Sequence, residues 1–326
     1  MKLASFKYKN ILHLGIAIDD DWLLPIDAVS SATSMMHLIS NGQTGFKDIQ
    51  GFIKEHADNQ EMLIPAAEVS WLPPLLNPGK ICGIAMNNSA SNARKISAPD
   101  HPAFFLKPSS CLVGHLNPIV VRSYYGSVHP EPELAVVIGK TGRDIEPEAA
   151  LDHVFGYTIF DDITGNGMRA EDLFRYYALY PKTDNPEEIE KVEQHLSYTA
   201  RYKGTDTFGC MGPWLVTADE ISDPDNLKVQ CSIGGELIAD DSTRYYNFNV
   251  AEVISFISRF HTLYAGDVIS MGTAFKPSAT RKSIHHANLQ VVPGPVEVEI
   301  EGLGKLINPI VLEKGDLGRW RLNPKD

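Results

Sequence analysis

The feature that most constrains this chain is a short apolar strand that begins with two glutamates. Residues 131–139 read EPELAVVIG. Side chains two apart in a strand share a face, so Glu131 and Glu133 should point the same way, beside Ala135 and Val137. Carboxylates on an apolar face are costly to bury unless their charge is compensated. An oxygen-preferring divalent cation such as Mg²⁺ would compensate it; a solvated strand face is the alternative.

A second run places two further carboxylates at a strand end. Residues 156–160 are strand-like and are followed by Asp161 and Asp162. Neighbours in a strand face opposite ways, so only one of the two can join the glutamates. The pattern alone does not choose between them, and either could instead cap a turn.

Composition narrows the class of protein. The 326 residues, 43% hydrophobic and 21% charged, predict a globular chain of about two domains. A net charge of −12 without any Lys/Arg block indicates that nucleic acid is not the partner. The four cysteines are far apart and form no CxxC, which favours reduced thiols over zinc or disulfides. No signal-peptide pattern or membrane-length apolar run is found, so we expect a cytoplasmic protein without membrane contact.

The Pro-rich segment 71–79 predicts a linker between two units. We expect a small N-terminal α/β domain over 1–75 and a larger, strand-rich domain over 80–326. Within the larger unit, Asn249 is a good N-cap, and the apolar spacing after it predicts a helix. The charged stretch 182–195 is expected to form a surface helix or a mobile loop.

Several segments, in order, resemble the fumarylacetoacetate hydrolase family. The resemblance runs from about Lys80 to Pro309, and it rests on FFLKPSS (104–110), EPELAVVIGK (131–140), GYTIFDDIT (156–164), KGTDTFGCMGPWLVTADEI (203–221), AGDVISMGT (265–273) and EGLGKLINP (301–309). It implies an α+β fold, with a β-rich catalytic domain built as a mixed β-roll and a small N-terminal α/β domain beside it. It also implies a homodimer.

The resemblance further implies site residues. The family's metal ligands fall on Glu131, Glu133 and Asp162, with Mg²⁺ or Mn²⁺ as the usual occupant, so Asp162 is selected over Asp161. The family's pocket lysine falls on Lys203. Two residues are expected to bind the substrate: Thr273, at the family's carboxylate-binding threonine, and Arg169, which could reach an anionic group.

The sequence departs from the family at the general base. Hydrolytic and decarboxylating members carry a His, and a Glu three residues later, on a short lid helix; here Ser89 and Asn92 occupy these catalytic positions. Neither side chain accepts a proton at neutral pH without a neighbouring base. His101, His115 and His129 are alternative bases. The pair His285–His286 is not expected to share a metal, because strand neighbours diverge.

We therefore expect a divalent-metal-dependent enzyme that acts on a small 2-oxo or 1,3-dicarbonyl acid through a metal-bound enolate. The metal would be a Lewis acid, and Lys203 would place positive charge near the developing oxyanion. Resemblance favours a hydrolase that cleaves a C–C bond. The replaced His–Glu pair favours an isomerase, tautomerase or decarboxylase instead. A non-catalytic, metal-dependent oxo-acid-binding protein is the third hypothesis.

Overall fold

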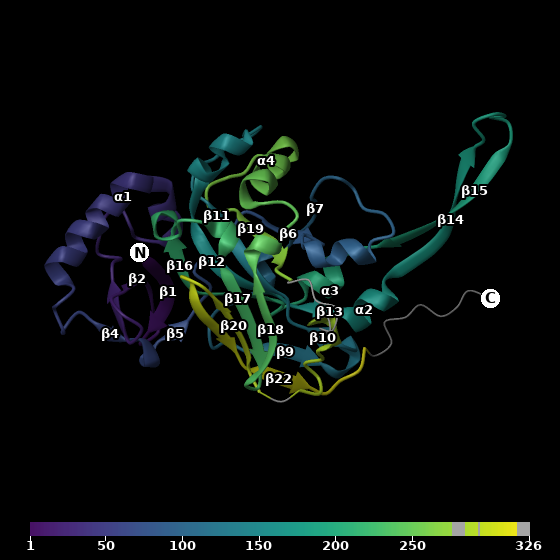
Figure 1. Ribbon diagram of the computed structural model, residues 1–326. Helices are drawn as coiled ribbons and strands as arrows, with labels where there is room; N and C mark the ends of the chain where they lie inside the picture. Colours follow the sequence, from purple (N-terminus) through teal and green to yellow (C-terminus); the bar gives the residue numbers. More distant parts are fainter. Residues whose placement is uncertain (276–283, 293, 318–326) are drawn as a thin grey trace.

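The computed structural model describes residues 1–275, 284–292 and 294–317, and its centre is one large twisted sheet (Figure 1). Most neighbouring strands in it are antiparallel, and β6 and β19 form a parallel pair. In spatial order the strands are β4 (Ile64–Pro65), β3 (Trp22–Pro25), β2 (Ile11–Ala17), β1 (Lys2–Tyr8), β16 (Gly209–Thr217), β12 (Val154–Asp162), β11 (Pro132–Ile138), β19 (Val268–Thr273), β6 (Ile81–Ala85) and β7 (Ala103–Lys107). Two short strands, β5 (Ser70–Trp71) and β8 (Leu112–Val113), pair beside this path.

Both faces of this sheet are covered, which explains why its central strands are apolar at nearly every position. On one face, Leu134 and Val136 belong to a core shared with a four-stranded sheet and helix α4 (Val250–Phe260). On the other face, Ala135 and Val137 pack in a second core with helix α1 (Met35–His56). The four-stranded sheet runs in the order β18 (Glu236–Ser242), β17 (Lys228–Ile233), β20 (Val296–Ile300) and β21 (Gly304–Asn308). The predicted α+β class is confirmed.

The N-terminal segment is joined to the rest through the main sheet. Strand β1 pairs antiparallel with β16, in the register Lys2↔Val216. Strands β2 and β3 form a hairpin, and α1 (Met35–His56) covers it. The two predicted units therefore share one continuous sheet.

The remaining helices and short strands surround the central sheets. Helix α4 (Val250–Phe260) begins with a capping box in which Asn249 and Glu252 exchange hydrogen bonds, as the sequence predicts. No helix in the described parts of the chain is long and apolar enough to cross a membrane. The other elements are α2 (Asn166–Glu171), α3 (Ala200–Gly204), the pair β10 (Val128–His129) and β13 (Thr164–Gly165), and the pair β9 (Ile119–Arg122) and β22 (Ile310–Glu313).

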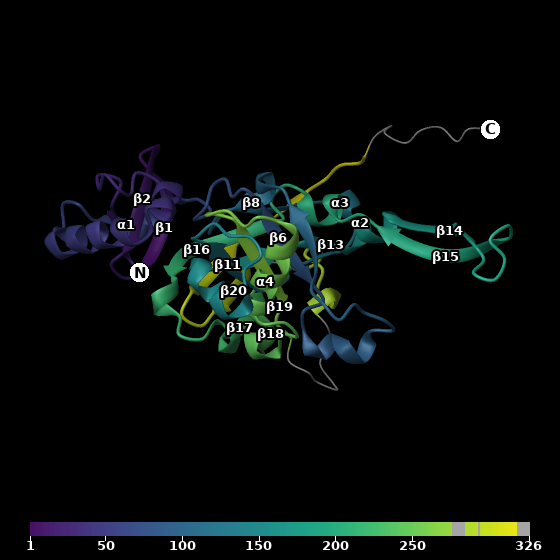
Figure 2. The ribbon, with the colours of Figure 1, turned by 90° about the horizontal axis from the view of Figure 1, so that it is seen from above.

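The charged stretch 182–195 forms neither of the expected structures. It is the tip and second strand of a long β-hairpin, made of β14 (Leu173–Pro181) and β15 (Ile189–Ser197), that projects away from the body (Figures 1 and 2). Nine residue pairs align the two strands. The expectation from the sequence rested on the charges and missed the partner strand 173–181, whose aromatic residues favour extended backbone.

Candidate active site

The pairing of β11 with β12 brings the three predicted carboxylates together. Glu133 lies opposite Phe160, so Phe160 and Asp162 share the face of Glu133. The backbone amide of Asp162 donates to the carbonyl of Glu131 at 2.9 Å, which places Asp162 beside the first glutamate. Carboxylate oxygens of Glu131, Glu133 and Asp162 all lie within 4.8 Å of one another. Asp161 faces the other way and accepts a hydrogen bond from the Glu131 amide at 2.7 Å.

Glu133 is as deeply buried as Asp162, each with 1% of its surface exposed. Burial, followed by the charges of Asp162 and Glu131, raises the pKa of Glu133 well above its usual range. The hydroxyl of Ser270 and the backbone amide of Gly272 donate to one of its oxygens at 2.5 and 2.9 Å. These donors fix the carboxylate in place, but they leave its negative charge uncompensated.

Two lysines approach the carboxylates from opposite sides. Lys203, on α3, donates to Glu131 at 2.9 Å and to Asp162 at 2.5 Å. Burial opposes its charged form, but the carboxylates of Asp162, Glu131 and Glu133 outweigh that effect and raise the pKa of Lys203. Lys107, at the end of β7, donates to the second oxygen of Asp162 at 2.5 Å. Both lysines therefore form ion pairs with the carboxylate of Asp162.

A pair of histidines supports Glu131. His129 is fully buried, and its Nε2 lies 2.9 Å from Glu131 Oε1 and 2.7 Å from His285 Nδ1. The two rings meet edge to face, with centroids 4.6 Å apart. Burial opposes ionisation of Glu131, but Lys203 and His129 together hold the pKa of that carboxyl well below its usual range. Glu131 is thus an ionised carboxylate in contact with both Lys203 and His129.

The donor set fits a hard divalent cation. Three carboxylates meet two lysines, so one negative charge remains unmatched when all three are ionised. Oxygen ligands are those that Mg²⁺ and Mn²⁺ prefer, and three of them leave about half of an octahedral shell for substrate and water. His129, Glu131 and His285 also converge closely enough to hold a softer ion. The hydrogen bonds within that second group assign its histidines a supporting role toward Glu131.

A small cavity opens directly onto this cluster. Its volume is about 150 Å³, and Glu131 and Lys203 form its polar floor. Thr273, at the end of β19, and Arg169, on α2, lie in the same lining. The walls are largely apolar, and they include Ile84, Met86, Phe105, Phe275 and Ile284. The arrangement suits a small acid with a polar end at the carboxylates and an unsaturated or apolar remainder.

The comparison with known proteins decides the family. The fumarylacetoacetate (FAA) hydrolase C-terminal domain matches residues 80–311, well over half of the chain. The chain belongs to the fumarylacetoacetate hydrolase family. That match covers the whole cavity lining just described, and it confirms the resemblance inferred from the motifs.

Relatives within the fumarylacetoacetate hydrolase family differ in the reactions their names state. Oxaloacetate tautomerase FAHD2B of Bos taurus is 33% identical over 95% of this chain and 92% of its own. Maleylpyruvate hydrolase of Sphingobium sp. SYK-6, solved with manganese(II) and pyruvate, is 26% identical with a TM-score of 0.70, covering 96% of this chain and 99% of its own. A probable 2-hydroxyhepta-2,4-diene-1,7-dioate isomerase of Mycobacterium abscessus is 25% identical with a TM-score of 0.69, over 97% and 100%.

The names of these relatives bear on three expectations: the activity, the metal and the location of the protein. Tautomerase, isomerase and hydrolase relatives all fit an enzyme of small oxo acids, and manganese occurs in one of their structures. The name of the bovine relative includes a mitochondrial location. A cytoplasmic location for this chain therefore stays a prediction.

The family's lid positions lie apart from the cavity lining. Ser89 and Asn92 belong to a short 3₁₀ segment after β6, and neither is among the described residues that line the cavity. Asn92 is exposed, donates to Asn247 Oδ1 at 2.9 Å and accepts from Lys95 at 3.0 Å. In this structure the lid therefore offers the substrate neither an imidazole nor a carboxylate from these two positions.

The structure distinguishes the three histidines that were considered as alternative bases. His101 stacks on Phe256, and His115 packs against Trp71 and accepts from the Ile307 amide at 3.1 Å. Neither is in the described cavity lining. Only His129 adjoins the carboxylates, and it is shielded from the cavity by His285.

Two contributors went unrecognised in the sequence. Lys107 lies in the FFLKPSS motif, yet nothing in the spacing shows that its side chain reaches Asp162. His285 lines the cavity and touches His129, although strand spacing counted against the pair it belongs to. Residues 284–286 form a 3₁₀ turn and not a strand, which invalidates that spacing argument.

Proposed function

We propose that this chain is a divalent-metal-dependent enzyme that interconverts the keto and enol forms of a small 2-oxo acid. The observation that carries the proposal is a cluster of three carboxylates and a lysine beside a small cavity, in a chain whose lid segment lacks the family's His–Glu pair. Tautomerisation moves a proton between carbon and oxygen and needs no activated water. The similarity to oxaloacetate tautomerases supports this reading.

Glu131, Glu133 and Asp162 would hold Mg²⁺ or Mn²⁺. When bound, such an ion supplies Lewis-acid stabilisation of the enolate that both tautomers share. Lys203 adds a fixed positive charge at the cavity floor, where negative charge grows on the substrate oxygen. The apolar walls exclude water and strengthen this electrostatic effect.

The rest of the lining orients the acid. The Thr273 hydroxyl, at the strand end beside Glu133, would bind a carboxylate of the substrate. Arg169 is exposed at α2 and brings positive charge to the cavity lining. An oxo acid with a second carboxylate would thus be bound at both ends, as would oxaloacetate.

Hydrolytic C–C bond cleavage is the second candidate. The similarity to a maleylpyruvate hydrolase solved with manganese and pyruvate favours it. It requires a group that activates water, and Ser89 and Asn92 do not provide one.

Product analysis with the Mg²⁺-loaded and Mn²⁺-loaded protein separates the candidates. Decay of the enol absorbance of oxaloacetate without release of pyruvate supports the tautomerase. Release of pyruvate and a second acid from acylpyruvates supports the hydrolase. Tight binding of oxo acids without any turnover would leave the binding-protein hypothesis standing and refute both enzymatic ones. Glu131→Ala is the control that ties each result to the metal site.

A further inference from the structure

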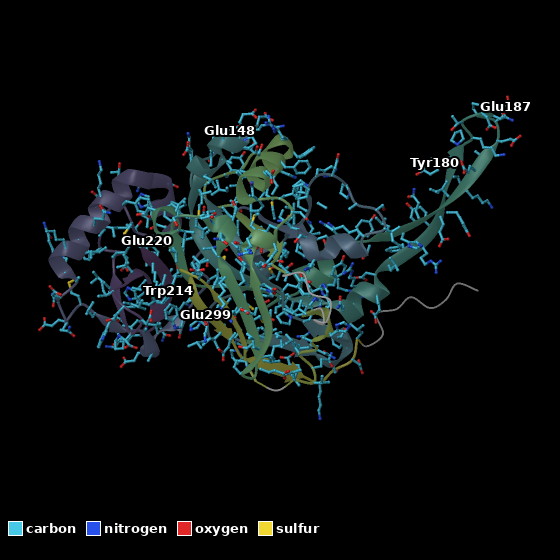
Figure 3. The ribbon with its side chains drawn as sticks, in the orientation of Figure 1. Glu148, Tyr180, Glu187, Trp214, Glu220 and Glu299 are labelled. Atoms are coloured by element: carbon cyan, nitrogen blue, oxygen red, sulfur yellow. The ribbon has the colours of Figure 1, made fainter. Side chains whose placement is uncertain are left out.

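Helices α2 and α3, which flank the base of the β14–β15 hairpin, each carry one cationic side chain of the cavity lining. Arg169 lies on α2, and Lys203 lies on α3. The hairpin that joins the two helices extends away from the body, and in Figure 3 the labelled Tyr180 and Glu187 lie toward its far end. The outer part of the hairpin therefore gives the two helices no support. The placement of Arg169 relative to Lys203 depends on contacts at the base.

Arg201 spans this base from α3 to α2. Its guanidinium donates to Asp172 at 3.0 Å, to Glu171 at 2.9 Å and to the backbone carbonyl of Met168 at 3.1 Å. The Met168 carbonyl belongs to the last turn of α2, where a cationic side chain can cap the helix. The six residues of α2 are too few for a helix that is stable alone, and no side chain caps its N-terminus. Arg201 thus fixes α2 against α3.

Arg169 differs from the other two arginines of this region in its partners. Arg201 and Arg175 are each paired with acidic neighbours. In the described parts of the chain, the Arg169 side chain forms no hydrogen bond or ion pair, although it lines the cavity. A guanidinium binds a carboxylate through two parallel hydrogen bonds. The cavity lining therefore offers a guanidinium to an anionic group of the substrate.

We propose that Arg201 is a positioning residue that makes the cavity select dicarboxylic oxo acids. Its bridge holds α2 so that Arg169 binds the second carboxylate of the substrate, while the oxo-acid end lies at the carboxylate cluster beside Lys203. We base this role on the proposed function, whose substrate class it narrows. An oxo acid without a second carboxylate has no group for Arg169 to bind, so its affinity is independent of the bridge.

The bridge should act on substrate binding and not on the chemical step, because the Arg201 guanidinium contacts α2 and the residue after it. We expect Arg201→Gln to raise the KM of oxaloacetate about tenfold or more and to leave kcat within about threefold, the pattern of a lost uniform binding interaction. The dissociation constant of oxaloacetate should rise by the same factor. That of pyruvate, which lacks the second carboxylate, should stay within about threefold.

Kinetics with oxaloacetate and calorimetry with oxaloacetate and pyruvate, on the Mn²⁺-loaded full chain, measure these effects. Arg175→Gln is the matched control, because Arg175 donates twice to Glu193 within the hairpin and does not join the two helices. It should leave every constant within about threefold. Asp172→Asn weakens the bridge from its other end and should reproduce the Arg201→Gln pattern. Arg201→Lys keeps the charge but not the fork, so its KM should lie between those of wild type and Arg201→Gln.

A double-mutant cycle tests whether Arg201 acts through Arg169. Arg169→Gln should also weaken oxaloacetate alone, and the double variant should lose no more than Arg169→Gln, because both changes remove the same interaction. Multiplied losses in the double variant, equal weakening of oxaloacetate and pyruvate, or unchanged oxaloacetate binding in Arg201→Gln would overturn the proposal. Absence of turnover in the wild type would instead refute the proposed function, and the two dissociation constants would still test the role of Arg201.

Discussion

Lys107 Nζ lies 2.5 Å from Asp162 Oδ1, and at most 2% of either side chain is exposed. The same ammonium group donates to the backbone carbonyls of Lys203 and Phe208. Lys107 therefore compensates the carboxylate of Asp162 and also donates to backbone carbonyls in and after α3. Lys107 thus contributes both to the stability of the fold and to the geometry of the candidate site.

Replacing this lysine should destabilise the protein more than any other single lysine change that we consider. Removing one partner of a buried ion pair costs about 3–5 kcal/mol, and here it would leave Lys203 as the one lysine paired with Asp162 and the carbonyls of Lys203 and Phe208 without this donor. We expect Lys107→Met to lower the free energy of unfolding by about that amount in chemical denaturation. Lys191→Met, at an exposed position on β15, is the control and should stay within about 0.5 kcal/mol. Equal effects from the two changes would contradict the role assigned to Lys107.

Glu133 should stabilise the metal complex at the expense of the metal-free protein. Its pKa is raised well above the unfolded value, so the folded state binds the extra proton between the two values. The stability of the metal-free protein therefore falls as pH rises through that window. We expect Glu133→Gln to raise the metal-free melting temperature by about 2 °C or more, with an advantage that grows with pH, while Mn²⁺ binding is lost.

Calorimetric unfolding from pH 5 to 8, with a chelator present, measures the Glu133 effect. Ser270→Ala is a useful companion, because it removes a hydrogen bond to Glu133 but keeps its charge. That variant should lower stability. A Glu133→Gln protein that is less stable than wild type at every pH would show that the carboxylate is better compensated than the geometry indicates.

Lys203 should act on turnover more than on metal affinity. It lines the cavity and carries a charge that its carboxylate neighbours maintain. Loss of a comparable oxyanion-stabilising group lowers kcat by about 10²–10³. We expect that loss for Lys203→Met in the oxaloacetate assay, with Mn²⁺ affinity retained. A kcat within threefold of wild type would remove Lys203 from the chemistry.

The lid can be tested by restoring the family residues. In Ser89→His with Asn92→Glu, the new carboxylate would stand where Asn92 now accepts from Lys95. If the lid supplies the water-activating base, the double variant should hydrolyse an acylpyruvate at least ten times faster than wild type. Ser89→Ala with Asn92→Gln controls for the loss of the native contacts. No gain in a folded, metal-binding double variant would count against the lid as the determinant of reaction type.

Local patterns predicted much of the fold, and the reasons lie in particular residues. The N-cap Asn249 and the apolar spacing after it depend on neighbours in sequence, so helix α4 was predictable. The stretch 182–195 was predicted wrongly as a helix or loop, because it is charged and its strand β15 is extended through pairing with 173–181. The joining of β1 to β16 is a long-range contact without a local signal.

The candidate site was likewise predictable only in part. Spacing along a strand paired Glu131 with Glu133, but only family resemblance selected Asp162. The structure supplies the physical reason, the register that sets Glu133 opposite Phe160. Lys107 and His285 reach the cluster from strands and turns far away in sequence, so spacing could not identify them. The roles of Ser89 and Asn92 stay a prediction that the lid variants test.

Metal-dependent turnover tests the central claim most directly. Mn²⁺ binding and loss of the oxaloacetate enol signal should be measured together, on wild type and on Glu131→Ala, before and after chelation. We predict one Mn²⁺ per chain, turnover that chelation abolishes and Mg²⁺ or Mn²⁺ restores, and neither binding nor turnover in Glu131→Ala. Undiminished turnover in the chelated protein, or in Glu131→Ala, would contradict the account.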